Sequence, residues 1–258
     1  MISGSPAASP APVPGARGPR PREWVFLAAA LVMGVIFCRL GVWQLQRLGE
    51  RRARNAQVMQ RLALPAVPLA ALPRDSAEAH YRRARVSGTY DFAHEVLFIN
   101  RIRDGAPGVH LVTPVIPDSR TLGDTAVLVD RGWVYSPDAA TVDATKWREP
   151  THVDGAGYIQ EYVRTGQFPA AMVGHPDRFR WLDPAVLSLA VGHPVGPYYV
   201  VLDTEPDLAI RHLPQRIPTP PLDEGPHLSY AIQWFAFAAI AVVGAVIVVF
   251  VLPRRRPA

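Results

Sequence analysis

Two long apolar segments lie near the two ends of the chain and enclose a more polar middle. Residues 230–252 form a run of 23 positions without a charged side chain, and residues 24–45 are 22 positions with one charge, Arg39. At ~1.5 Å per residue, a helix of this length extends roughly 35 Å, which is enough to cross a bilayer. The pattern therefore predicts two transmembrane helices, with Arg39 reaching toward the membrane surface.

The first apolar segment has a second interpretation as a cleaved signal peptide, because basic residues precede it. Its apolar run continues past any small-residue cleavage site, and Phe37 precedes Cys38 where a lipoprotein signal needs a small residue. An uncleaved helix is therefore favoured. Residues 46–62 are rich in arginine and carry a weak apolar stripe, so we expect them to continue this helix beyond the membrane.

The middle of the chain alternates short runs rich in Val, Ile, Tyr and Thr with turns of Asp, Gly and Pro, a pattern typical of strands. Prolines keep residues 64–74 extended. Short helices are expected at residues 137–144 and 184–190, the second with Asp183 as its N-cap and Pro184 at its first position. This pattern predicts a mostly antiparallel β domain, a small barrel or a sandwich. The predicted strands lie around residue 86 and begin near residues 95, 108, 126, 152 and 197, and the clearest turn is R-D-G-A-P-G at residues 103–108.

The net charge of +5 is concentrated at the ends of the chain. Residues 46–226 hold 20 of the 27 Lys and Arg residues and 21 of the 22 Asp and Glu residues, which leaves a net charge of −1. Basic residues beside apolar helices orient a membrane protein. A nucleic-acid partner, which requires a basic face on the folded domain, is therefore not expected.

The arginine cluster at residues 254–256 predicts a cytoplasmic C-terminus, and two spans place the N-terminus on the same side. Arg39 and the arginines at residues 47–54 favour the opposite orientation, but long loops cross membranes largely regardless of their charge. The expected fold class is a membrane α+β protein, with two transmembrane helices flanking a mostly antiparallel β extracytoplasmic domain. The expected parts are a disordered cytoplasmic tail (1–22), the first span (23–45), the extracytoplasmic domain (46–226), the second span (227–252) and a basic cytoplasmic tail (253–258).

Composition and motifs restrict the compartment and the chemistry. The proline-rich start cannot form the amphipathic helix of a transit peptide, so a bacterial plasma membrane is preferred to mitochondria. Cys38 is the single cysteine, which rules out an intramolecular disulfide. The sequence contains no nucleophile elbow, phosphate-binding loop or dinucleotide fingerprint, and no H-x-x-x-H or C-x-x-C spacing. We therefore expect a protein that is not an enzyme.

Polar and aromatic residues open the second span. His227, Tyr230 and Trp234 fall at i, i+3 and i+7 on one helical face. Together with Trp43 at the end of the first span, the aromatic residues have an ordinary interpretation as a belt at the membrane surface. His227 and Gln233 fit a belt less well, because polar groups at a membrane edge tend to face protein or ligand. A neutral imidazole there could also ligate a haem iron, and both interpretations stay open on the residues alone.

Arg131, Gly132 and Trp133 close one of the predicted strands. Their ordinary interpretation is a strand end capped by an aromatic side chain, with Arg131 paired to an acid across the sheet. A second interpretation is a functional motif. The residues alone favour the ordinary one.

Several motifs, taken in order, resemble the surfeit locus protein one family of cytochrome c oxidase assembly factors. The resemblance covers about residues 24–252. Asp130 differs from the family, which more often has Asn, and residues 165–200 carry no matching motif. The motifs are G-V-W-Q-L-Q-R at residues 41–47, G-A-P-G-V-H-L-V-T-P-V at 105–115, L-V-D-R-G-W-V at 128–134 and H-L-S-Y-A-I-Q-W-F at 227–235.

The resemblance implies a respiratory-chain chaperone that matures the haem-containing subunit of a haem–copper oxidase. It implies transient haem a binding, with His227 as the ligand of the haem iron. The implied partners are cytochrome c oxidase subunit I, other assembly factors and the lipid bilayer. The alternative is a cofactor-free membrane scaffold that holds oxidase subunits during assembly. The candidate cofactor-binding residues are His227, Trp43, Tyr230 and Trp234, and the candidate motif or partner-contact residues are Gly41, Gln44, Arg47, Arg131, Gly132, Trp133 and Gln233.

Overall fold

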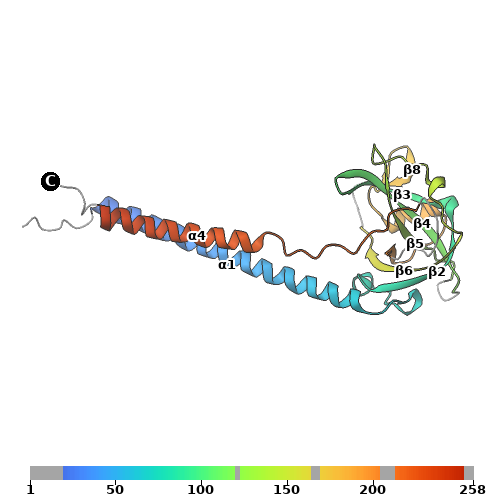
Figure 1. Ribbon diagram of the computed structural model, residues 1–258, viewed down its shortest axis with the longest axis horizontal. Coiled ribbons are helices and arrows are strands. Elements are labelled where there is room, and N and C mark those ends of the chain that lie inside the picture. Colours follow the sequence, from blue (N-terminus) through green and yellow to red (C-terminus); the bar gives the residue numbers. More distant parts are fainter. Residues whose placement is uncertain (1–19, 120–122, 164–168, 204–212, 253–258) are drawn as a thin grey trace, which may run out of the picture. The chain divides into compact units, whose positions relative to one another are not determined.

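The computed structural model describes residues 20–119, 123–163, 169–203 and 213–252 (Figure 1). The predicted basic tail at residues 253–258 lies outside these ranges, and so does the predicted disordered tail except for residues 20–22. The chain forms two compact parts. The first combines Met1–Asn55 with Asp223–Ala258, and its described residues are mainly helical; the second, Ala56–Leu222, contains the β-sheet.

Two long helices dominate the first part. Helix α1 (Pro21–Ala63) has 43 residues, and helix α4 (His227–Val246) has 20 residues and continues as a π-helical turn, Ile247–Val251. Figure 1 shows α4 lying alongside the first half of α1. Both helices are long and apolar enough to cross a membrane. They fit a membrane protein, and the predicted continuation of the first helix through its arginine-rich half is confirmed.

Small side chains allow α1 and α4 to pack closely. A Cβ atom on Gly34 would lie 2.8 Å from Val242, and one on Gly41 would lie 2.7 Å from the ring of Phe235. A seven-residue spacing keeps positions on one helical face, and small residues on that face let two backbones approach. The buried positions at this spacing are Gly34, Gly41 and Leu48 on α1, and Ala231, Ala238 and Ala245 on α4.

The described residues of the β domain form one sheet of nine strands in the order β1-β2-β6-β9-β5-β4-β3-β8-β7. An additional pairing of β2 with β4 closes the strands β2, β6, β9, β5 and β4 into a ring. This closed ring is a small β-barrel. Of the two architectures that the sequence predicts, a barrel or a sandwich, the barrel is therefore confirmed. The strands are β1 (Val67–Pro68), β2 (Arg83–Tyr90), β3 (Val96–Arg103), β4 (Ala106–Pro117), β5 (Val127–Tyr135), β6 (His152–Glu161), β7 (Ala171–Met172), β8 (His175–Phe179) and β9 (Tyr198–Leu202).

The sheet is mixed, so the prediction of a mostly antiparallel domain is wrong. Strand β9 runs parallel to β5, β8 runs parallel to β3, and β1 runs parallel to β2. The parallel β5–β9 pair arises because the chain passes through β6, β7, β8 and helix α3 (Pro184–Val191) before it returns to β5. Parallel neighbours require such a long crossover. The six strands that the apolar pattern predicts are present as β2 to β6 and β9. Strands β1 and β7 have only two residues each, and β8 has the mostly polar sequence H-P-D-R-F, so none of the three gives an apolar pattern.

Side chains from all five ring strands meet in one buried core. This core includes Val86 of β2, Val115 of β4, Val129 of β5, Ile159 of β6 and Val200 of β9. Each of these residues is at most 1 % exposed. The core explains why these segments are rich in β-branched residues, which pack well on a pleated surface.

Local turn chemistry fixes two of the predicted elements. The β3–β4 hairpin turns at Asp104 and Gly105, whose φ angles of 50° and 80° fit the two-residue turn that aspartate and glycine favour. Helix α3 begins after Asp183, whose side chain accepts a hydrogen bond from the backbone N–H of Ala185 at 3.1 Å. Both predictions are confirmed.

The helix predicted at residues 137–144 is wrong. The Asp138 carboxylate accepts hydrogen bonds from the backbone N–H groups of Ala140 and Thr141 at 3.0 and 2.8 Å, and Ala139 has a φ of 54°. This side chain therefore stabilises a turn in place of a helix. Four hydrogen bonds to this carboxylate, led by the one from the Ser136 hydroxyl, lower the pKa of Asp138. The predicted extended segment at residues 64–74 also includes a short 3-10 turn, Leu69–Ala71.

Candidate functional site

A hydrogen bond between α1 and α4 joins two residues that the sequence singles out. The Nδ1 atom of His227 lies 2.9 Å from Oε1 of Gln44, and both side chains are partly buried. With the Gln44 oxygen as acceptor, Nδ1 carries the imidazole proton and Nε2 retains its lone pair. This is the tautomer that a histidine needs in order to ligate a metal through Nε2.

Salt bridges and hydrogen bonds hold the segment that leads into His227. Arg52 donates two hydrogen bonds of 2.7 Å to the carboxylate of Glu224, and Arg51 reaches Asp223 at 3.3 Å. The hydrogen bond from Arg52 lowers the pKa of Glu224 below its usual value. Gly225 then turns the chain with a φ of 67°, just before α4 begins. These contacts fix the entry of the chain into α4 and therefore the position of the imidazole.

Trp234 and Gly41 lie in the contact between the two helices. The Trp234 ring stacks on Phe37 of α1, with centroids 5.7 Å apart and an interplanar angle of 25°. Gly41 faces the ring of Phe235, which occupies the space of the missing Cβ. Both residues therefore stabilise the helix pair, in addition to any role toward a ligand.

Four other residues that the sequence singles out are solvent-exposed on this helical part. Trp43 is 46 % exposed and Tyr230 is 45 % exposed. Gln233 is also exposed, and Arg47 lies over the Trp43 ring at 5.6 Å while it pairs with Glu50 at 2.8 Å. The helical part thus has two exposed aromatic side chains that are close in sequence to the Gln44–His227 pair. Trp43 precedes Gln44, and Tyr230 follows three residues after His227.

Arg131 lies at the centre of a buried ionic network in the β domain. Its side chain is 0 % exposed and pairs with Glu95 at 2.5 Å and with Glu149 at 3.2 Å. It also donates to the Thr113 hydroxyl at 2.8 Å. Glu149 in turn accepts two hydrogen bonds from Arg216, at 3.0 and 2.6 Å. The predicted pairing of Arg131 with an acid is therefore present.

Gly132 and Trp133 attach a distant segment of the chain to strand β5. The backbone N–H of Trp133 donates to the carbonyl of Gln215 at 2.8 Å, and the N–H of Gln215 donates back at 2.8 Å. A Cβ on Gly132 would lie 2.4 Å from the Gln215 oxygen, and Gly132 has a φ of 134°. The Trp133 indole is buried over Gly108 and donates to the carbonyl of Arg101 at 3.2 Å. The contacts of Arg131, Gly132 and Trp133 are therefore internal to the domain.

Substituting Gly132 with alanine is expected to destabilise the β domain by about 2–3 kcal/mol, because the new methyl group collides with Gln215 in a backbone conformation that favours glycine. The melting temperature of the full-length protein, followed by circular dichroism of the sheet, measures this loss. Gly155→Ala is the matched control, since a Cβ there would meet Leu202 at an ordinary 3.5 Å. Equal melting temperatures for the two variants would contradict the prediction.

The sequence does not reveal the partners of Arg131. Glu95, Glu149 and Arg216 lie far from it along the chain, and nothing in their local pattern distinguishes them from surface charges. Their low exposure, 5 or 6 % for each side chain, becomes apparent only once the strands are assembled. Among the described residues no group of three or more His, Cys, Asp or Glu side chains is arranged to hold a metal ion.

Comparison with known proteins shows that this chain is similar in sequence to several SURF1-like proteins. An uncharacterized SURF1-like protein of Mycobacterium tuberculosis is 27 % identical over 230 residues, which are 86 % of this chain and 81 % of that protein. A SURF1-like protein of Rickettsia felis is 26 % identical over 235 residues, 87 % of this chain and 95 % of that protein. One from Monosiga brevicollis is 27 % identical over 227 residues, 82 % and 83 % of the two chains. The pattern of the SURF1 family matches residues 31–239, and the chain belongs to this family.

Proposed function

We propose that this protein assists the assembly of a haem–copper oxidase by holding haem a for delivery to the catalytic subunit. Membership of the SURF1 family supports the general role in oxidase assembly. Two helices that are long and apolar enough to span a membrane support a location beside a membrane-embedded oxidase. In this proposal the membrane is a bacterial plasma membrane, both termini are cytoplasmic and the β domain lies outside the cytoplasm.

The observation that carries the proposal is the hydrogen bond from His227 to Gln44. Haem a, when bound, supplies an iron that a neutral imidazole can ligate. The residues present fit this group, because the Gln44 side-chain oxygen accepts a hydrogen bond from Nδ1–H of His227 and leaves Nε2 available. A Cβ on Gly225 would lie 3.6 Å from Nε2, so the glycine also keeps this side of the imidazole open.

The other residues of the helical part would bind and shield the ligand. Trp43 and Tyr230 offer the large exposed aromatic surfaces on which an apolar macrocycle can lie. Arg47, close to the Trp43 ring, is a cation that suits an acidic substituent of the ligand. A single protein ligand suits a carrier, because release requires that only one bond to the iron be exchanged. The proposal involves no chemical conversion, so the protein acts as a chaperone and not as an enzyme.

The proposed function is tested in a host strain from which the gene has been deleted. Oxidase purified from this strain should contain less haem a per catalytic subunit, and a plasmid with the wild-type gene should restore it. The haem content is measured as the pyridine haemochrome and normalised to the amount of subunit I. An unchanged content of haem a per subunit I in the deletion strain would contradict delivery.

A cofactor-free scaffold is the second candidate, favoured by the close packing of α1 and α4 through Gly41 and Trp234. Under this alternative the deletion strain would lose association between oxidase subunits, while each remaining subunit I would keep its full haem a. The wild-type protein, purified from membranes that contain haem a, would then show no haem absorption spectrum. The two measurements together separate the two candidate functions.

A further inference from the structure

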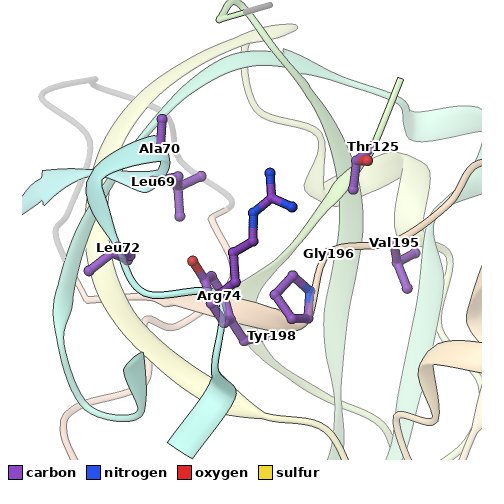
Figure 2. A pocket seen from close by; sticks show the side chains of 9 residues that line it. Leu69, Ala70, Leu72, Arg74, Thr125, Val195, Gly196 and Tyr198 are labelled. Carbon is purple, nitrogen blue, oxygen red and sulfur yellow. The ribbon is translucent and has the colours of Figure 1, made fainter. Parts of the chain in front are cut away.

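The β domain contains a pocket of about 530 Å³ that shares no lining residue with the ionic network. It is formed by the segment before β2, by Thr125 just before β5, and by the loop before β9 (Figure 2). Leu69, Leu72 and Tyr198 belong to the buried core of the five-strand ring, so the pocket opens onto one side of that core. Pockets that bind small molecules usually have volumes of about 300–1,000 Å³, and this volume lies in that range.

Backbone hydrogen bonds hold both walls of the pocket. On one side the N–H of Leu72 donates to the carbonyl of Leu69 at 3.1 Å, which closes the 3-10 turn. On the other side Ala126 donates to the carbonyl of Pro194 at 2.8 Å, and Gly196 donates to the carbonyl of Ala126 at 3.1 Å. A pocket whose walls are already fixed loses little entropy when a ligand binds.

Arg74 is the one charged side chain among the residues that line the pocket. Figure 2 shows its guanidinium group extending across the pocket between Leu69 and Thr125. Within the described part of the chain, Arg74 makes no hydrogen bond and no salt bridge. The neighbouring acid, Asp75, is engaged elsewhere, because its carboxylate caps helix α2 (Ser76–Ala79) and accepts from the N–H of Ala77 at 2.8 Å. The pocket therefore combines several apolar side chains with an exposed cation that has no anionic partner among the described residues.

We propose that this pocket binds a small molecule with an apolar body and one carboxylate, which pairs with Arg74. The apolar body would lie against Leu69, Leu72 and Val195, and the Thr125 hydroxyl could donate a further hydrogen bond to the carboxylate. A single guanidinium neutralises a monoanion but leaves a dianion such as a phosphate monoester partly uncompensated. This pocket shares no residue with the proposed haem a site, and the proposal does not depend on that site.

The test compares two soluble probes of the same shape, 4-phenylbutyrate and its uncharged amide, with the full-length protein in nanodiscs of zwitterionic lipid. Saturation-transfer NMR, with empty nanodiscs as background, measures both dissociation constants. The wild-type protein should bind the carboxylate about tenfold more tightly than the amide, as expected for a charge-assisted hydrogen bond. Arg74→Gln should abolish this preference, and Arg74→Glu should instead favour 4-phenylbutylamine.

Arg180→Gln is the matched control, because Arg180 is exposed and does not line the pocket. This variant should retain the preference for the carboxylate. Octanoate should compete with the probe. Equal binding of carboxylate and amide by the wild-type protein, or the same preference in Arg74→Gln, would overturn the proposal. Displacement of the probe by a peptide with a C-terminal leucine but not by octanoate would overturn the assignment to a small molecule.

Discussion

Replacing Glu149 with glutamine is expected to lower the melting temperature of the protein by roughly 10 °C, which corresponds to a loss of about 3–5 kcal/mol. The Glu149 side chain is 5 % exposed and pairs with both Arg131 and Arg216. After the substitution, Arg131 keeps the carboxylate of Glu95, while Arg216 loses the carboxylate that accepts two of its hydrogen bonds. Water cannot reach these charges to compensate for the loss, so the cost is large.

The melting temperature is measured on the full-length protein by circular dichroism of the β-sheet. Glu78→Gln, at an exposed position of α2, is the matched control and should change the stability by no more than about 0.5 kcal/mol. The double variant Glu149→Gln/Arg216→Met should recover part of the loss, because it also removes one of the two buried cations. If Glu149→Gln melts at the same temperature as Glu78→Gln, the network does not stabilise the domain.

The sequence predicts the secondary elements well where one local signal decides them. Apolar length alone predicts the two long helices, the alternating pattern predicts six strands, and Asp104 with Gly105 predicts the β3–β4 turn. These signals are local because they depend on helix length, on runs of β-branched and aromatic residues, and on turn chemistry. The wrong prediction of a helix at residues 137–144 also has a local cause. The Asp138 carboxylate accepts a hydrogen bond from the backbone N–H of Ala140 and stabilises a turn, which outweighs the weak helical propensity of this segment.

The arrangement of the strands could not be predicted, because it depends on contacts between distant segments. The pairing of β5 with β9 joins Val129 to Val200, and the pairing of β2 with β4 joins Thr89 to Ile116. A strand with apolar residues fits beside several others, in either direction, so its pattern does not select a neighbour. This is why the sheet is mixed where an antiparallel one was expected.

The candidate site could be predicted in part. The motif residues Gln44 and His227 were both chosen from the sequence, but their hydrogen bond spans 183 positions of the chain and requires the register of α1 against α4. Gly34, Gly41 and the alanines of α4 set that register, and within an apolar run small residues give no obvious signal. For the buried network around Arg131, the sequence predicts only that Arg131 pairs with an acidic side chain, and it does not indicate which one.

Substitutions of the hydrogen-bonded residues Gln44 and His227 are expected to have a large effect on haem a binding. His227→Ala is expected to eliminate haem a from the purified protein, since it removes the proposed iron ligand. Gln44→Leu should weaken haem a binding by about 10–100-fold, because the imidazole loses the acceptor that fixes its orientation and tautomer. Titration of haem a into the protein in detergent, followed by its absorption spectrum, measures both effects.

The matched control for Gln44 is Gln233→Leu, which changes the same side chain at an exposed position on the other helix. It should bind haem a like the wild type, and Gln44→Glu should restore the orientation of His227 because a carboxylate is also an acceptor. If Gln44 had only a structural role, Gln44→Leu would lower the melting temperature, and Gln44→Glu would not restore the haem absorption spectrum. Equal haem a occupancy in His227→Ala and in the wild-type protein would exclude the histidine as the ligand. In that case the Gln44–His227 pair would serve only to hold α1 and α4 together, as the scaffold alternative requires.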